Sequence, residues 1–210
     1  MSRRLTRVFG LFALAAASSA AAQDPPAGKA DGPVPGPFRA FVVSDPRTDA
    51  KNPRNRVNMM HDLVTESGLN PTVVVFARTT PAAADAPAAR LARQLDALAQ
   101  KYRADRLGAA VVFLTLGKEY PEDEQRDEKA KAVRDLAEQL KLQNVPFALA
   151  GGGGEQAKAW GLQEGHDLTV VLYDRLKVLK TWTFAADKPP ADDAVKQIAD
   201  AVEAAVKTQK

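Results

Sequence analysis

Hydrophobic positions along the chain repeat with two different periods, and the two kinds of segment alternate. The continuous apolar runs Thr72–Ala77 and Ala109–Leu116 are typical of strands that are buried on both faces of a sheet. Apolar residues three and four positions apart predict helices over Pro81–Arg103, Glu122–Leu142 and Asp192–Val206. Alternating strands and helices favour parallel pairing through right-handed crossovers.

Shorter segments complete the predicted order of elements. We expect strands at Phe38–Ser44 and Pro146–Ala150, a short helix within Val57–Glu66, a helical turn at Gln156–Trp160, and a β-hairpin formed by Leu168–Tyr173 and Val178–Phe184. The sequence therefore predicts an α/β fold in three layers, a mixed sheet with helices on both faces that ends in a β-hairpin and a helix. Trp160, Trp182 and Phe184 are expected in its core.

The N-terminus has the pattern of an export signal. Three arginines, at positions 3, 4 and 7, precede the apolar run Val8–Ala17, and the small residues Ser18–Ala22 follow. The apolar stretch is shorter than the roughly 20 residues that span a bilayer. We therefore expect a signal peptide over residues 1–22, cleavage after Ala22, no membrane span afterwards, and a periplasmic or extracellular protein.

The segment after the signal differs in composition from the rest of the chain. Residues 23–37 contain five prolines and three glycines, a composition that does not support a ladder or a core. We interpret them as a disordered linker, followed by one domain over residues 38–208.

Charge and cysteine content narrow the possible functions. The chain has 29 Lys and Arg against 26 Asp and Glu, so removing the three signal arginines leaves no net charge. A neutral chain has no long-range field to attract a polyanion, and we expect no nucleic-acid partner. The absence of cysteine from the sequence excludes thiol chemistry, zinc fingers and disulfides.

The order of elements and the texture of several short stretches resemble the thioredoxin-like superfamily, especially its peroxiredoxin branch. Val145–Leu149 is similar to a short strand of the family, and Ala157–Leu162 to an aromatic–glycine turn. The stretches Thr169–Asp174 and Lys177–Leu179 are similar to the closing hairpin, and Pro71–Phe76 to the central strand that leads to the active site.

The chain departs from this family where the family carries its chemistry. The resemblance implies a redox cysteine just after the central strand and a cis-proline just before the hairpin. Here the first segment reads Ala77-Arg78-Thr79-Thr80-Pro81, and Leu168 precedes Thr169. The hairpin turn has Leu176 where the family often has glycine. We therefore expect a degenerate member without thiol redox activity.

The five candidate ligand-binding residues are Arg78, Thr79, Thr80, His166 and Asp167. The first three follow the central strand, at the carboxyl end where open α/β sheets bind ligands, and just before the predicted helix. They could bind a small anion, although helix capping by a threonine explains the same pattern and is the interpretation we favour.

Neither a metal nor a cofactor is expected. The two histidines each have an adjacent aspartate, His61-Asp62 and His166-Asp167, but adjacent side chains point apart and make poor chelates. The glycine run 151–154 is followed by Glu155 and Gln156 in place of the Lys-Ser or Lys-Thr of a phosphate loop, so we expect a turn.

The sequence favours an exported binding or scaffold module with no enzymatic activity and an unknown protein or small-molecule partner. A non-thiol enzyme, or a small-anion-binding protein that uses Arg78–Thr80 at a helix N-terminus, remains the alternative. The enzyme hypothesis requires that this segment and the pair His166-Asp167 converge in one pocket.

Overall fold

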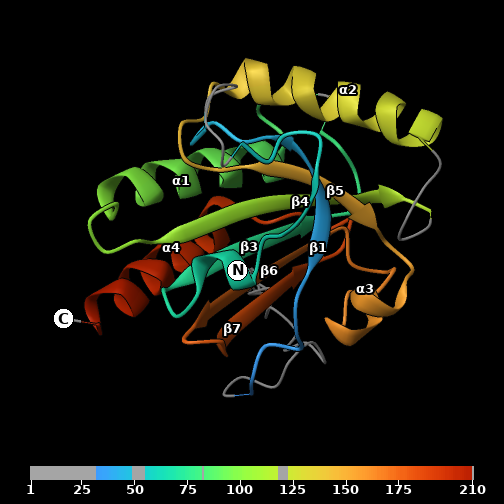
Figure 1. The fold of residues 1–210 in the computed structure, drawn as a ribbon. Helices are drawn as coiled ribbons and strands as arrows, with labels where there is room; N and C mark the ends of the chain where they lie inside the picture. The colour runs from blue at the N-terminus through green and yellow to red at the C-terminus, as the bar shows by residue number, and fades with distance from the viewer. Residues whose placement is uncertain (1–31, 49–54, 82, 118–122, 210) are drawn as a thin grey trace, which may run out of the picture.

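A computed structural model describes residues 32–48, 55–81, 83–117 and 123–209. Its strands are β1 (Arg39–Ser44), β2 (Met60–Asp62), β3 (Thr72–Ala77), β4 (Gly108–Leu116), β5 (Phe147–Gly151), β6 (Leu168–Asp174) and β7 (Lys177–Phe184). Its helices are α1 (Pro87–Lys101), α2 (Asp123–Leu140), α3 (Glu155–Ala159) and α4 (Asp192–Lys207), with a 3₁₀ turn, η1, at Thr65–Ser67. Figure 1 shows their arrangement in layers.

The strands form one mixed sheet in the order β2-β1-β5-β4-β3-β6-β7. β3 pairs in parallel with β4 and antiparallel with β6, and β4 pairs in parallel with β5. The segment Thr72–Ala77 is therefore an interior strand, as its apolar run predicts. The predicted α/β fold with a mixed sheet is confirmed.

Alternate residues of the interior strands face two separate cores. On β3, Val73 and Val75 belong to one core, whereas Val74 and Phe76 belong to the other. Because successive side chains of a strand point to opposite faces, a strand covered on both sides must be apolar throughout. This explains the continuous run that marks the strand in the sequence.

The two faces of the sheet are covered unequally. Buried side chains of α1, α2 and α4 share the larger core. The opposite core contains Ala157 of α3 together with Phe38, Phe76 and Trp160, whose rings lie 4.8 to 5.9 Å apart. Trp160, Trp182 and Phe184 are all buried, which confirms their predicted place in the core.

The closing hairpin has a tight two-residue turn. Arg175 and Leu176 both have positive φ angles, 50° and 58°, as the preferred hairpin turns require. Leu176, at the position where the resemblance suggested glycine, packs against the core that contains Tyr173 and Val178. This contact accounts for a leucine in a conformation that glycine adopts more readily.

The structure corrects the helix predicted within Val57–Glu66. The chain there forms strand β2, which pairs with β1 through Phe41 and Met60, and then the turn η1. The Asp62 carboxylate accepts backbone hydrogen bonds from Phe38 and Val64, at 3.0 Å each. The backbone polar groups of this segment therefore find hydrogen-bond partners at the edge of the sheet and do not need those of a helix.

The helix predicted from Pro81 begins later, at Pro87. Both prolines suit a first helical turn, but the backbone N–H of Arg78 extends the sheet by donating to the Asp167 carbonyl oxygen at 2.8 Å. The chain leaves the sheet only after that bond, and a turn over Ala83–Ala86 precedes the helix.

Residues before the predicted boundary at Phe38 also pair with the domain. The backbone N–H groups of Val34 and Val178 donate to the carbonyl oxygens of Leu176 and Gly32, at 2.9 and 2.8 Å. The end of the predicted linker thus pairs with the hairpin. The rest of it, residues 23–31, the signal segment 1–22 and the expected start of α2 at Glu122 lie outside the described residues. No helix in the described part of the chain is long and apolar enough to cross a bilayer.

Candidate functional site

At the carboxyl end of β3, Arg78 fastens three segments together. Its guanidinium donates to the carbonyl oxygens of Leu162 at 2.6 Å, Gln163 at 3.0 Å and Gly152 at 3.2 Å. These carbonyls lie in the turn after β5 and in the loop after α3. The rigid fork of a guanidinium suits several fixed acceptors at once. Arg78 is therefore a structural link, and the solvated arginine assumed for a capped helix is not observed.

Within the glycine run 151–154, the hydrogen bonds of Arg78 require a glycine at position 152. A Cβ atom there would lie 2.9 Å from Arg78 Nη1 and 2.9 Å from the Leu114 carbonyl oxygen. Any larger residue would displace the guanidinium or strand β4. The other glycines have different places, since Gly151 ends β5 and Gly154 caps α3.

Thr79 and Asp167 meet beside this link. The Thr79 hydroxyl donates to the Asp167 carboxylate, at 3.2 Å from Oδ1 and 3.4 Å from Oδ2. Together with apolar residues such as Leu168, Phe184 and Pro190 they line a hollow of about 80 Å³. Pockets for small-molecule ligands usually enclose about 300–1,000 Å³, so this hollow holds little more than water.

The other two candidate residues do not join the hollow. Neither Thr80 nor His166 lines it, and His166 Nδ1 is buried with no hydrogen-bond partner among the described residues. The predicted place of Arg78–Thr80 at a helix N-terminus is wrong, because α1 begins at Pro87, and the Arg78 guanidinium donates to carbonyls. For the same reason, neither threonine caps the helix. The described residues contain no cluster of three or more side chains suited to a metal ion.

A much larger cleft lies at the opposite end of the sheet, where β4 begins. It encloses about 970 Å³ between the last turns of α1, the start of β4, the loop after α2 and the loop after β1. In Figure 1 the end of α1, the beginning of β4 and the end of α2 lie on the left side of the molecule.

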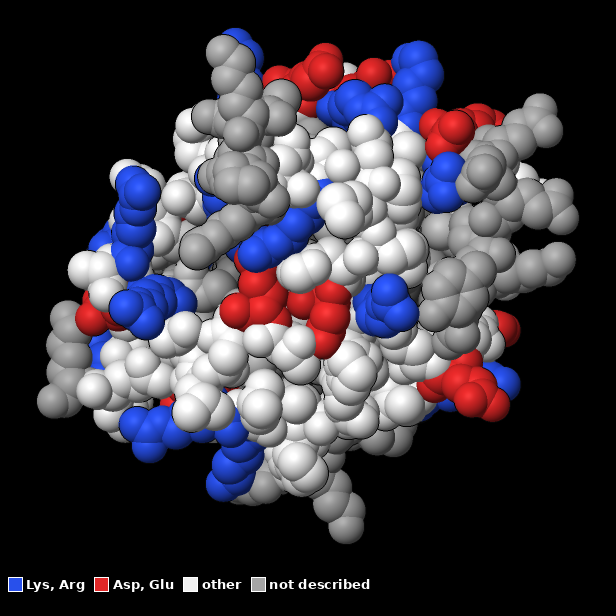
Figure 2. Space-filling model, viewed as in Figure 1, with Lys and Arg blue, Asp and Glu red and all other residues white. Residues whose placement is uncertain are grey.

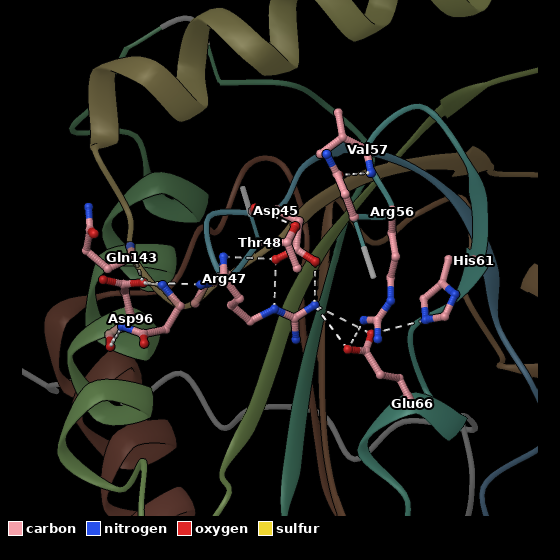
Figure 3. A network of polar contacts seen from close by, with 12 residues as sticks. Asp45, Arg47, Thr48, Arg56, Val57, His61, Glu66, Asp96 and Gln143 are labelled. Atoms are coloured by element: carbon pink, nitrogen blue, oxygen red, sulfur yellow. Dashed lines mark hydrogen bonds and ion pairs between the residues drawn. The ribbon is translucent and has the colours of Figure 1, made fainter. Parts of the chain in front are cut away.

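Arg47 and Glu66, which line one wall of this cleft, belong to a network of ion pairs (Figure 3). The Arg47 guanidinium binds Asp45 through two bonds of 2.8 Å and reaches Glu66 at 3.2 Å. Glu66 also pairs with Arg56, and its other oxygen lies 3.3 Å from His61 Nε2. The network ties the loop after β1 to η1, and its two carboxylates balance its two guanidinium groups.

The buried member of this network is Asp45, which is 4% exposed. Burial disfavours the charged carboxylate, but the hydrogen bonds and charge of Arg47 outweigh it and hold the pKa of Asp45 below its usual value. Asp45 therefore remains ionised at neutral pH.

Asp96 of α1 forms part of the opposite wall. Its Oδ1 atom accepts three backbone hydrogen bonds, from Gln143, Asn144 and Val145, at 3.0, 2.7 and 3.2 Å. Figure 3 shows this carboxylate turned toward the loop that follows α2. Asp96 thus fixes the loop, and its negative charge remains in the lining of the cleft.

Sequence reasoning identified neither the network nor the cleft. Asp45 and Arg47 pair within one polar segment, but Glu66, which joins Arg47 to Arg56, comes from η1, farther along the chain. Arg93 and Asp96 stand three apart, a spacing typical of an ion pair within a helix, and only the structure shows that the carboxylate is used elsewhere. The signal in the sequence that could have indicated the cleft is the occurrence of three arginines, Arg93, Arg103 and Arg106, within and just after one helix.

The arrangement of the sheet and helices defines a thioredoxin-like fold. Neither a family model nor a curated protein matches the sequence. Solved structures do match, and the likeness extends over most of the chain.

Three of these structures illustrate the range. The structure of peroxidoxin BcpB from Mycobacterium tuberculosis superposes with a TM-score of 0.56 at 14% identity, covering 87% of this chain and 99% of that one. The structure of an uncharacterised conserved protein from Geobacillus kaustophilus superposes with a TM-score of 0.55 at 19% identity, covering 87% of this chain and 83% of that one. The structure of a putative thiol:disulfide interchange protein DsbE from Chlorobium tepidum superposes with a TM-score of 0.51 at 14% identity, covering 81% of this chain and 99% of that one. At such identities the likeness establishes the fold, and the chain carries that fold without a cysteine.

We predict that Arg78→Met lowers the free energy of unfolding by about 2–3 kcal/mol, because three carbonyls lose a charged donor. Arg78→Lys should recover only part of this loss, since one ammonium cannot span all three acceptors. Urea denaturation measures both. The matched control is Arg134→Met, at an exposed position of α2, which should change stability by less than about 0.5 kcal/mol. Equal stability of the Arg78 and Arg134 variants would contradict the role assigned to Arg78.

We predict that Asp45→Asn costs about 2–3 kcal/mol at pH 7, because it leaves Arg47 without its buried partner. Arg47 holds the folded-state pKa of Asp45 below the usual value of an aspartate, so the pair contributes fully at pH values above that usual pKa. This contribution is lost as the pH falls through the lowered pKa of the folded state. The stability difference between wild type and variant should therefore stay constant near neutral pH and shrink in acid. Urea midpoints measured from pH 7 to pH 3 test this, and a difference independent of pH would count against the ion pair.

Proposed function

We propose that this chain is an exported, thioredoxin-like binding module that performs no thiol redox chemistry. The observation that carries the proposal is the set of hydrogen bonds formed at the carboxyl end of β3. There Arg78, Thr79 and Asp167 hydrogen-bond to one another's segments and close the position at which the resemblance places a redox cysteine. Disulfide exchange needs a thiolate, and the sequence offers none.

The geometry also argues against a non-thiol enzyme at the same place. Thr79 and Asp167 do converge, as that hypothesis required, but the adjoining hollow is about 80 Å³ and largely apolar in its lining. The guanidinium beside it is already satisfied by carbonyls. A substrate would have little space there and could not use the Arg78 guanidinium, which supports a binding role elsewhere on the surface.

Export rests on the N-terminal pattern of arginines, an apolar run and small residues. A domain that works outside the cytoplasm without disulfides must obtain its stability from its core. The two cores described above, one on each face of the sheet, fit that requirement. We propose a periplasmic or extracellular location, with a protein or small-molecule partner.

Redox assays test the first part of the proposal. The purified chain should reduce insulin disulfides and consume hydrogen peroxide no faster than a buffer blank, because it has no sulfur nucleophile. Asp167→Asn is assayed in parallel. Turnover above the blank that this variant lowers would overturn the proposal and place an enzyme at the β3 terminus.

Fractionation and N-terminal sequencing test the second part. We expect the exported chain to begin at Gln23, because Ala20 and Ala22 provide the small residues that signal cleavage requires. Ala22→Arg should leave the precursor uncleaved, whereas the same substitution at Ala27, beyond the cleavage site, should have no effect. A full-length chain that remains in the cytoplasm would refute export.

A further inference from the structure

We propose that the cleft at the start of β4 binds a small polyanion, a molecule with at least two carboxylate or phosphate groups, through Arg93, Arg103 and Arg106. The cleft encloses about 970 Å³, at the upper end of the range for small-molecule sites. All three arginines line it. This inference rests on the proposed binding function, because it names the site at which that binding would take place.

The three guanidinium groups lack partners in the described part of the chain. No ion pair or side-chain hydrogen bond joins Arg93, Arg103 or Arg106 to another described residue, although Arg47, Arg56 and Arg78 all have such partners. The acids that share the cleft are occupied, since Glu66 pairs with Arg47 and Arg56. Asp96 holds the loop after α2 through three backbone N–H groups.

The charge of the cleft therefore remains positive after internal pairing. The network of Asp45, Arg47, Arg56 and Glu66 is balanced, and the three arginines exceed the one remaining acid of the lining, Asp96, by two charges. Asp105 lies between two of them in sequence but does not line the cleft, and it has an interaction of its own. In Figure 2 basic side chains project at the left edge of this face, the side on which α1 ends, while acidic ones gather near its middle.

Backbone hydrogen bonds hold the loop that carries two of these arginines. After Tyr102, successive backbone bonds join Arg103 to Gln100, Asp105 to Tyr102, and Arg106 to Arg103. Arg106 itself has a φ angle of 57°, a conformation in which asparagine or glycine is less strained than arginine. Backbone strain of this kind is common at functional sites.

Guanidinium groups also determine the class of ligand. Their planar donors match the two oxygens of a carboxylate or the oxygens of a phosphate, and several groups around one cleft favour a ligand with several charges. Carboxylates and phosphates share this chemistry, and the experiment distinguishes them.

Isothermal titration calorimetry of the full chain tests the proposal with citrate, tripolyphosphate and acetate at matched ionic strength. We expect one site per chain for citrate or tripolyphosphate, with an affinity at least about tenfold above that for acetate. The triple variant R93Q/R103Q/R106Q should weaken binding by about tenfold or more. The control K129Q/K158Q/K188Q removes the same charge at exposed positions away from the cleft, and should keep binding within about twofold.

A single variant separates binding from folding. Arg106→Asn relieves the positive φ angle, so its melting temperature should equal or exceed that of the wild type while its affinity falls. Absence of binding to both polyanions, or an equal loss in the two triple variants, would overturn this site. Neither result would affect the redox or export assays, so failure of the site and failure of the proposed function are distinguishable.

Discussion

Burial of β3 on both faces is the constraint on which the rest of the structure depends. Val73 and Val75 must be covered by one layer, and Val74 and Phe76 by another, so a single strand requires helices or loops on two sides. Parallel pairing of β3 with β4 needs a crossover connection, which α1 supplies. Antiparallel pairing of β3 with β6 places the hairpin next to β3. The carboxyl end of this strand therefore meets the segment before β6, whatever residues stand there.

At that meeting point the chain uses polar residues to join segments. Arg78, Thr79 and Asp167 form bonds within the protein, and the space left beside them is small. At the opposite end of the sheet the polar residues divide into two groups. One group, around Asp45 and Glu66, is paired within the protein, whereas Arg93, Arg103 and Arg106 have no side-chain partner among the described residues. The same residue type thus serves as a structural link at one end and remains available at the other.

Much of this could be predicted from the sequence, because it is encoded locally. The strand runs, the helical periodicities and the hairpin predict the order of elements, and all but one of the predicted elements occur with small changes of boundary. The exception is the helix predicted within Val57–Glu66, where the chain forms β2 and η1. β2 has only three residues and pairs with β1. The start of α1 could not be predicted, because Pro81 and Pro87 suit a helix start equally and a bond between Arg78 and Asp167 decides between them.

The sequence by itself determined that the chain has strands buried on both faces, an N-terminal pattern typical of export, and no thiol. These properties depend on composition and on neighbours within a few positions. Only the tertiary structure decided what each arginine does. The carbonyls bound by Arg78 lie 74 to 85 positions further along the chain, and the amides that engage Asp96 lie 47 to 49 positions away. A hydrogen bond needs its partners within about 3 Å, and folding alone brings such distant residues that close.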